Sequence, residues 1–235
     1  MISDLGARFM SDSAGFARCG EMNLEPGLGM YVAGRFGVLG RVHSDVVAAN
    51  AVFFNPTSVA KEWNAAMELV DPATAANVYA SIAGEYGKVH FADVPRIDRW
   101  VELAERVVDS VSPVGAPMFA GWRALHRPDD VAARASLLSH VLRELRFSLH
   151  GNAVVAAGYS PVMAIICGSG DKAAGTLAFY GWPEPYPEPT EADRAGRWEV
   201  EEATNDLSTA TFSVLSDAEF EEFVALTEGM IESSV

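Results

Sequence analysis

Residues 130–159 read DVAARASLLSHVLRELRFSLHGNAVVAAGY, which is the longest uninterrupted helical pattern in the chain. Asp129 or Asp130 can cap its start, directly after Pro128, and Gly158 can end it. We therefore expect one long helix here, around which the other elements pack.

The two sides of this expected helix differ in chemistry. At about 100° per residue, apolar side chains gather on one side as a core face; they are Val141, Leu142, Leu145, Leu149 and Ala156. The opposite side runs from Ser139 to Val154 and carries Arg143, Arg146 and His150. Their i, i+3, i+7 spacing brings these three side chains within reach of a common partner. This stripe is either a solvated face or a basic lining for an anionic or carbonyl-bearing ligand.

The overall charge argues against a nucleic-acid partner. The chain has 235 residues, a formal net charge of −15 and a sequence pI of about 4.6. Such a chain is repelled by phosphate backbones unless a local basic patch compensates, and no run of Lys and Arg supplies one. We therefore expect no binding of random duplex DNA, even at low salt.

Metal, cofactor and membrane signals are missing from the sequence. Cys19 and Cys167 form no CxxC pair, and the histidines show no HExxH or comparable spacing, so we expect neither a metal nor a cofactor. The N-terminal segment does not resemble a signal peptide. No apolar run approaches the roughly 20 residues that span a bilayer. These features predict a soluble cytoplasmic protein without membrane contact.

Helix-start signals recur along the chain, whereas no stretch alternates with period two. Asn55-Pro56, Asp71-Pro72 and Ser160-Pro161 each place a capping side chain before a proline at the first helical position. Ser44 and Asp171 are the expected caps of the ranges 45–54 and 173–180. The glycine-rich range 27–40 is either a closely packed helix or a loose loop. We expect an all-α multi-helix bundle with about ten helices. The expected helical ranges are 7–16, 27–40, 45–54, 56–69, 73–87, 97–111, 116–125, 130–159, 162–167, 173–180, 191–207 and 218–231.

The C-terminal region differs from the rest in composition. Residues 181–191, GWPEPYPEPTE, carry four prolines at alternating positions, which favour an extended spacer or a segment that binds a partner domain. We expect a helical ligand-binding domain over 1–180, a proline-rich connector over 181–190 and a helical pair over 191–235. Within the first domain, 27–70 echoes 116–160, and this echo predicts an internal duplication.

Several motifs resemble a known family. They are YVAGRFGVLG (31–40), FFNPTSVA (53–60), PMFAGWRALHRPDD (117–130), LRELRFSLHGNAVVAAGYSP (142–161), EEATNDL (201–207) and FSVLSDAEFEEFVAL (212–226). Together they resemble the SalK-type helix-turn-helix family of actinobacteria over roughly residues 14–231. Family members look like LREHRGDGHVAALLAAGL where this chain has its most specific block. Four polar residues match, namely Arg143, Glu144, Arg146 and His150.

The resemblance also carries departures. Leu145, Ser148 and Leu149 stand where the family has His, Asp and Gly, so any chemistry of that cluster is altered or lost here. The resemblance implies an all-helical fold with a reduced, winged-helix-like C-terminal segment similar to the MarR type. Residues 181–198 stand where relatives continue into a helix and wing. On this basis we expect the segment that enters a DNA groove to be absent.

These observations predict a protein that binds a small organic ligand between helices, in secondary metabolism. The expected ligand-binding residues are Arg35, Asn55, Trp122, Arg143, Arg146 and His150. A buried Arg35 must meet a carboxylate or face a cavity. Asn55 is mainly a helix cap, and Trp122 is more often a core residue.

Two alternatives stay open. One is a cofactor-independent enzyme in which His150 is the general base and an arginine stabilises the developing negative charge. The other is a dimeric, regulator-like interaction protein that has lost DNA binding and uses its C-terminal helices as the interface. Phe212, Phe220 and Phe223 would then lie in that interface. Whether the chain is an enzyme is left undecided.

Overall fold

The computed structural model describes residues 1–233, and these residues form helices and connecting loops without a β-strand, which confirms the expected all-α fold. The helices before the long central one are α1 (Ile2–Leu5), α2 (Ser13–Phe16), α3 (Leu28–Phe36), α4 (Ser44–Ala51), α5 (Pro56–Met67), α6 (Pro72–His90), α7 (Ile97–Ser110) and α8 (Pro117–Arg123). The later ones are α9 (Val131–Ala156), α10 (Pro161–Ser169), α11 (Ala173–Phe179), α12 (Glu191–Ala210) and α13 (Asp217–Ser233). Short 3-10 turns lie at Arg8–Ser11, Cys19–Met22, Gly37–Leu39 and Gly170–Lys172.

The caps read from the sequence explain most helix starts. The side-chain oxygens of Asn55 and Asp71 accept hydrogen bonds from the first-turn N–H groups of α5 and α6, and a proline follows each cap. Asp130 accepts a hydrogen bond from the backbone N–H of Ala133 at 2.8 Å at the start of α9. Ser160 does the same for α10. Local side-chain chemistry therefore sets where these helices begin.

Three local expectations were wrong. His43, rather than Ser44, caps α4 by accepting a hydrogen bond from the backbone N–H of Asp45. Asp171 lies in the turn Gly170–Lys172 and makes no cap hydrogen bond to α11. The expected helix over 7–16 divides into a 3-10 turn and the short α2. At α4 the neighbouring His43 takes the capping position, whereas before α11 and within 7–16 a 3-10 turn stands where the expected cap or helix would be.

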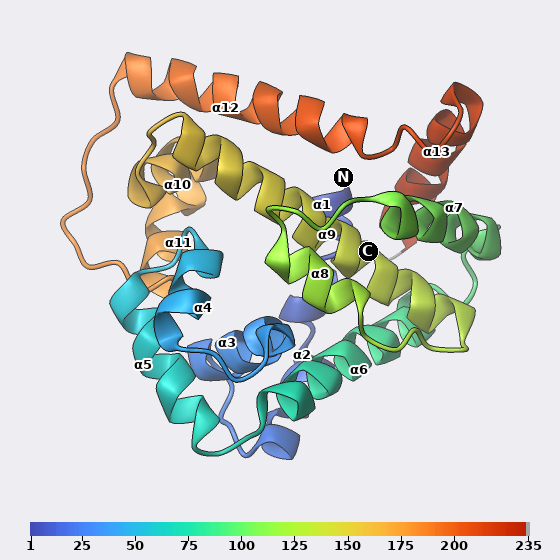
Figure 1. Cartoon of the computed structure of the whole chain (residues 1–235), viewed down its shortest axis with the longest axis horizontal. Helices are drawn as coiled ribbons and strands as arrows, with labels where there is room; N and C mark the ends of the chain where they lie inside the picture. Colours follow the sequence, from blue (N-terminus) through green and yellow to red (C-terminus); the bar gives the residue numbers. More distant parts are fainter. Residues whose placement is uncertain (234–235) are drawn as a thin grey trace.

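The long helix α9 is the centre of the fold, and α1, α6, α7, α8 and α12 all pack against it (Figure 1). Val141, Leu142 and Leu145 are buried as expected for the core face. The opposite side is not solvated, because Ser139 and Val154 are also buried, each with 1 % of its surface exposed. α9 is therefore enclosed along much of its length, and its polar side chains must find partners within the protein.

The glycine-rich range 27–40 forms α3 and the 3-10 turn after it, which confirms the closely packed alternative. A Cβ atom added at Gly34 would lie 2.5 Å from the ring of Tyr79, and one at Gly37 would lie 2.4 Å from the carbonyl oxygen of Pro72. Both neighbours belong to α6. The absence of side chains at these two positions therefore lets α3 approach α6 closely, and this contact holds Arg35 against the core.

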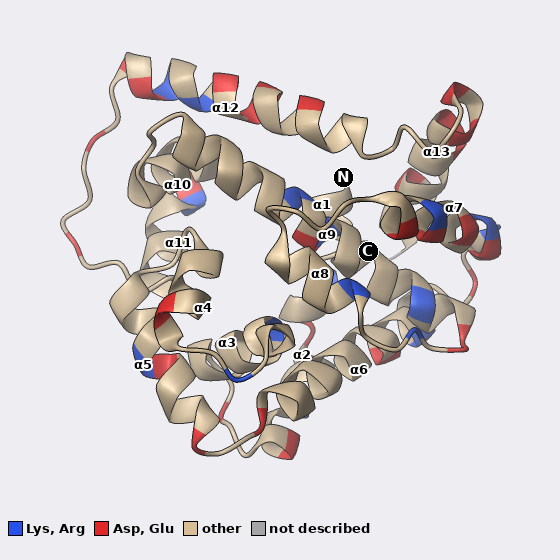
Figure 2. Ribbon diagram, in the orientation of Figure 1, with Lys and Arg blue, Asp and Glu red and all other residues tan. Residues whose placement is uncertain are grey.

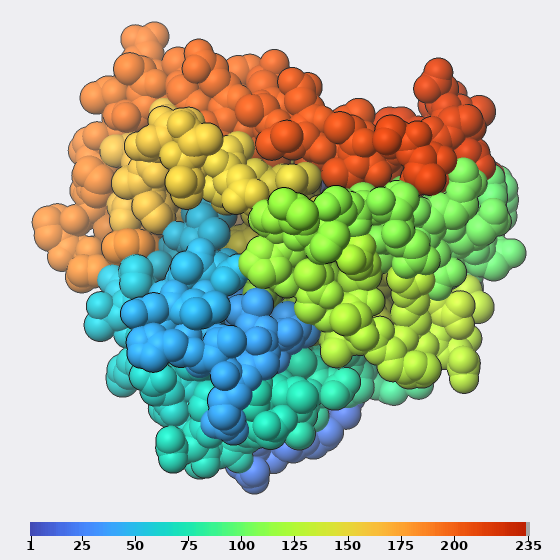
Figure 3. Space-filling view, viewed as in Figure 1, coloured from blue at the N-terminus to red at the C-terminus, as the bar shows by residue number. Residues whose placement is uncertain are grey.

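The C-terminal helices cover the outside of the bundle. Residues 181–190 form no helix, and after them α12 runs along α9 and α10 while α13 packs on α7 and α1 (Figures 1 and 3). Ion pairs hold α13 in place, because Glu219 binds Arg106 and Glu222 binds Arg99. These contacts place the C-terminal pair on the main body. The division into domains at 180 and 190 stays a prediction.

The negative charge is concentrated in this C-terminal region. Residues 181–235 contain 14 of the 32 acidic residues but only 2 of the 17 Lys and Arg, which gives them a net charge of −12. The remaining 180 residues have 18 acidic and 15 basic residues and a net charge of −3. Acidic positions recur along α12 in Figure 2. Most of the negative charge of the chain therefore belongs to residues 181–235, and the other 180 residues are close to neutral.

Two further observations concern the membrane and the internal echo. Among residues 1–233, no single helix is both long and apolar enough to cross a bilayer; α9 with α10–α11 meets the length and composition test only as a pair bent by 115°. Arg35 and Arg123 occupy corresponding positions in the ranges 27–70 and 116–160, but their surroundings differ. Arg35 pairs with a buried carboxylate, whereas Arg123 donates a hydrogen bond to the carbonyl oxygen of Val111 at 2.7 Å. An internal duplication stays a prediction.

Candidate functional site

A buried ion pair joins α3 to α9. Arg35 Nε lies 2.8 Å from Glu144 Oε1, and Arg35 Nη2 lies 2.9 Å from Glu144 Oε2, so the guanidinium and the carboxylate form two parallel hydrogen bonds. Arg35 also donates to the hydroxyl of Tyr31 at 2.9 Å. Both charged side chains are 1 % exposed or less. Of the two partners that the sequence left open for Arg35, the structure shows the carboxylate.

The electrostatics of Glu144 follow from its surroundings. Burial favours the neutral acid, but the positive charges of Arg35 and Arg143 outweigh burial and lower the pKa of Glu144 to about 2. Arg143 Nη1 lies 2.5 Å from the same Oε1 atom that Arg35 Nε contacts. Glu144 is therefore ionised at neutral pH and holds two arginines at once.

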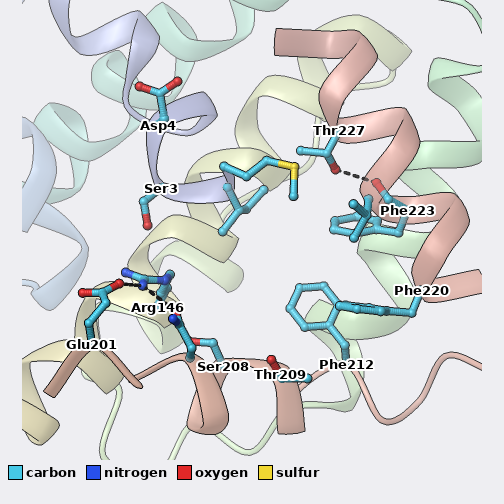
Figure 4. A pocket seen from close by; sticks show the side chains of 14 residues that line it. Ser3, Asp4, Arg146, Glu201, Ser208, Thr209, Phe212, Phe220, Phe223 and Thr227 are labelled. Atoms are coloured by element: carbon cyan, nitrogen blue, oxygen red, sulfur yellow. Dashed lines mark hydrogen bonds and ion pairs between the residues drawn. The ribbon is translucent and has the colours of Figure 1, made fainter. Parts of the chain in front are cut away.

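Arg146 is held by a different carboxylate, on α12. It donates hydrogen bonds to Glu201 and to Asn205, whose side-chain oxygen lies 3.0 Å away (Figure 4). Glu201 also accepts a hydrogen bond from Arg197 Nη1 at 3.0 Å. Burial opposes ionisation of Glu201, but the charge of Arg146 dominates and lowers its pKa. This cluster fastens α12 to the C-terminal half of α9.

His150 is part of the same fastening rather than a free base. The Thr204 hydroxyl donates to the carbonyl of Val200, so it accepts from His150 Nδ1–H at 2.9 Å. The other ring nitrogen, Nε2, lies 3.5 Å from Arg197 Nη2, which can only donate. Burial and then the charge of Arg197 lower the pKa of His150 to about 4. The neutral ring is thus fixed in one tautomer, with both nitrogens engaged.

The small-molecule hypothesis required Arg143, Arg146 and His150 to line one cavity. In the structure they line three different hollows. Arg146 lines a cavity of about 540 Å³ between α1, α12 and α13 (Figure 4). Arg143 lines a separate open hollow of about 670 Å³ beside α11, and His150 lines a third of about 160 Å³ beside α10. Both arginines already bind carboxylates. The expected common lining for one ligand is therefore not present.

The other predicted site residues have structural partners. Asn55 Oδ1 accepts hydrogen bonds from the N–H groups of Thr57 at 2.9 Å and Ser58 at 3.3 Å, as its cap role predicts. Trp122 is fully buried, and its indole N–H donates to the carbonyl of Arg35 at 3.1 Å. Neither side chain faces one of the three hollows. No observation tests whether these residues contact a ligand.

The C-terminal phenylalanines are engaged within the chain. Phe212 contacts both Phe220 and Phe223, with ring centroids 5.5 and 5.3 Å apart. Phe223 also stacks on Trp100 of α7 at 5.4 Å. These rings line the cavity of Figure 4 instead of projecting outward as one exposed patch. The packing gives no support to a dimer interface built on them.

Sequence reasoning missed a buried histidine on α9. His140 is 0 % exposed and lies between Trp122 and Phe9, with ring centroids 4.3 and 5.1 Å away. Its position in the sequence matches no metal-binding motif, so it is not among the candidate site residues predicted from the sequence. Its i, i+4 relation to Glu144 was the available signal, because that spacing places both side chains on one face of a helix. Within the described residues, no group of three His, Cys, Asp or Glu side chains could hold a metal ion.

The comparisons with known proteins give one match. The model of the Helix-turn-helix family matches residues 9–235, which is nearly the whole chain. No curated protein and no solved structure is detectably similar to it. This finding overturns two expectations, namely the small-molecule function with its enzymatic and degenerate-regulator alternatives, and the exclusion of nucleic acid as a partner. The exclusion failed because it used the net charge of the whole chain, most of which belongs to residues 181–235.

A match of this extent covers α2 to α13, including the central helix, the hairpin of α10 and α11, and the C-terminal pair. The polar residues of α9 lie within the matched range, and their side chains make contacts between helices. The chain belongs to the Helix-turn-helix family.

Proposed function

We propose that this protein is a DNA-binding, regulator-like member of its family, and that α10 and α11 form the part that meets DNA. The observation that carries the proposal is the hairpin itself. Two helices that pack on each other are joined by the three-residue turn Gly170–Lys172, which is the form that helix-turn-helix DNA readers use. In such a pair, the second helix is the one that approaches the groove.

The local charge of this hairpin permits the approach of a polyanion. Residues 151–180 contain one acidic residue, Asp171, and one basic residue, Lys172, so the segment is neutral overall. The acidic excess lies in residues 181–235. One of these acids, Glu201 on α12, pairs with Arg197 on the same helix and with Arg146 on α9. Repulsion from a phosphate backbone is therefore weaker at the hairpin than along α12.

The surface of α11 suits close contact. Ala174, Gly175 and Ala178 are exposed, so at these positions the backbone of α11 can come near another surface. Phe179 is the one large exposed side chain of this helix. Lys172 is exposed at the start of this surface, and Arg143 lines the same hollow from α9. Lys172 can neutralise a phosphate, whereas Arg143 is already held by Glu144. Asp171 opposes Lys172 within the same hollow, so we expect weak affinity that decreases as the salt concentration rises.

The finer resemblance to the SalK type belongs to this proposal. By this resemblance, residues 181–198 stand where relatives carry a helix and wing. Residues 1–180 form the body that holds the hairpin. We expect the protein to act in the cytoplasm, where DNA is accessible to it.

The test is binding of a fluorescently labelled random duplex, followed by anisotropy over a series of salt concentrations. One phosphate contact, at Lys172, predicts a slope of log K against log salt of about −0.9, with a dissociation constant in the range of about 10⁻⁴ to 10⁻⁶ M. Lys172→Ala should reduce the slope by about 0.9. The matched control is Lys88→Ala on α6, which removes a lysine remote from the hairpin and should leave the slope unchanged.

Three results would contradict the proposal. The first is no binding at a protein concentration of about 10⁻⁴ M and low salt, where non-specific binders are detectable. The second is an equal loss of affinity in the Lys172 and Lys88 variants, which would mean that only total charge matters. The third is binding that does not respond to salt.

A further inference from the structure

Two buried polar atoms near the Arg35–Glu144 ion pair have no hydrogen-bond partner among the described residues. They are the hydroxyl oxygen of Tyr79 on α6 and Nε2 of His140 on α9. The two side chains are 2 % and 0 % exposed, and their ring centroids are 6.4 Å apart. A buried polar group without a partner is costly, so two of them on rings whose centroids lie 6.4 Å apart require an explanation.

The hydrogen-bonding role of each atom can be assigned. His140 Nδ1 lies 3.2 Å from the carbonyl oxygen of Gly6, which can only accept, so Nδ1 carries the proton and donates it. Burial lowers the pKa of His140 to about 3, so the ring is neutral. Nε2 is therefore a lone-pair acceptor. The hydroxyl of Tyr79 keeps its proton, because burial raises its pKa well above the usual value.

Glu144 cannot be the partner that His140 needs. Its Oε1 atom lies 3.7 Å from His140 Nε2, but both atoms are acceptors, and this oxygen already accepts from Arg35 and Arg143. A charged His140 that donates to Glu144 would place a third cation beside the two arginines. The lone pair of Nε2 therefore requires a hydrogen from a different group.

We propose that one water molecule is bound between α6 and α9, where it accepts a hydrogen bond from the Tyr79 hydroxyl and donates one to His140 Nε2. The unmatched pair consists of one donor and one acceptor, so the ligand must both accept and donate. An anion would face the lone pair of Nε2, and a metal cation would face two arginines. Water meets both requirements, and buried waters occupy sites with two to four polar partners.

The first test is a crystal structure of the wild-type chain that resolves ordered solvent. We expect one solvent peak within about 3 Å of both Tyr79 Oη and His140 Nε2. Tyr79→Phe removes the donor and should weaken or abolish the peak. The matched control is Tyr186→Phe, which removes a hydroxyl that donates to the carbonyl of Trp182 in the connector, and it should leave the peak unchanged.

The second test works in solution and does not depend on a variant that folds. Nitrogen-15 spectra of the wild-type histidine side chains should show His140 protonated on Nδ1 only between pH 5 and 8. A proton on both ring nitrogens at pH 7 would overturn the proposal. So would a direct hydrogen bond from Tyr79 to His140 in the crystal, or a peak that is undiminished in Tyr79→Phe.

Discussion

Replacing Glu144 with glutamine should destabilise this protein more than any other single removal of a carboxylate. The substitution keeps the size of the side chain but leaves Arg35, whose side chain is 1 % exposed, as a buried cation without a counter-charge. Breaking a buried ion pair in this way costs about 3–5 kcal/mol. For a chain of this size, that corresponds to a fall in melting temperature of roughly 6–20 °C.

The assay is urea unfolding followed by circular dichroism and tryptophan fluorescence, since coincident transitions test whether one free energy describes the process. Glu201→Gln is the matched control, because its side chain is 29 % exposed and its two arginine partners can reach water. It should cost less than about 1 kcal/mol. Replacing both members of the buried pair, in Arg35→Met/Glu144→Leu, should recover part of the lost stability. Equal effects of Glu144→Gln and Glu201→Gln would refute the reasoning.

Two further predictions concern pH and packing. His140 and His150 have pKa values lowered to about 3 and about 4, below the ordinary 6.5, so the unfolded chain binds more protons as the pH falls below 6.5. The free energy of unfolding should therefore decrease from pH 6.5 towards pH 4, by up to about 1.4 kcal/mol per pH unit for each histidine. Urea titrations at several pH values measure this slope, and an unfolding free energy independent of pH in that window would contradict the assignment. On α6, Gly87→Ala should lower the melting temperature, because its Cβ would lie 2.3 Å from a backbone oxygen of α9, whereas at Gly84 the nearest atom lies at 3.5 Å. Gly84→Ala should raise stability by up to about 1 kcal/mol through helix propensity, and calorimetry that ranks the two variants in the opposite order would show that α6 and α9 are not packed as described.

Much of the fold could be predicted because its signals are local. Caps such as Asn55 and Asp71 bond to backbone groups two or three residues away, so their effect is visible in a short window of sequence. The glycines of 27–40 likewise predicted that this helix packs closely against another element. They did not show that the other element is α6. The errors at Ser44 and Asp171 are also local, because the adjacent His43 side chain caps α4 and the 3-10 turn Gly170–Lys172 directly precedes α11.

The site could not be predicted in the same way. The spacing of Arg143, Arg146 and His150 correctly placed them on one side of a helix, but it could not show what that side would face. Their partners are Glu144 itself and residues of α12, about 50 positions further along the chain, brought there by tertiary packing. The net charge of −15 was equally misleading, because a total over the chain does not show where on the molecule the charges lie.

The uneven distribution of charge gives the molecule an electric dipole moment. A molecule with a net −12 over its last 55 residues and −3 over the other 180 experiences a torque near any highly charged rod or sheet. Near a negatively charged rod or sheet, the molecule turns so that the side formed by α12 and α13 points away from it before contact is made. The encounter is thus oriented at a distance, over a range of about 10 Å at 0.1 M salt, and this orientation fades as the ionic strength rises.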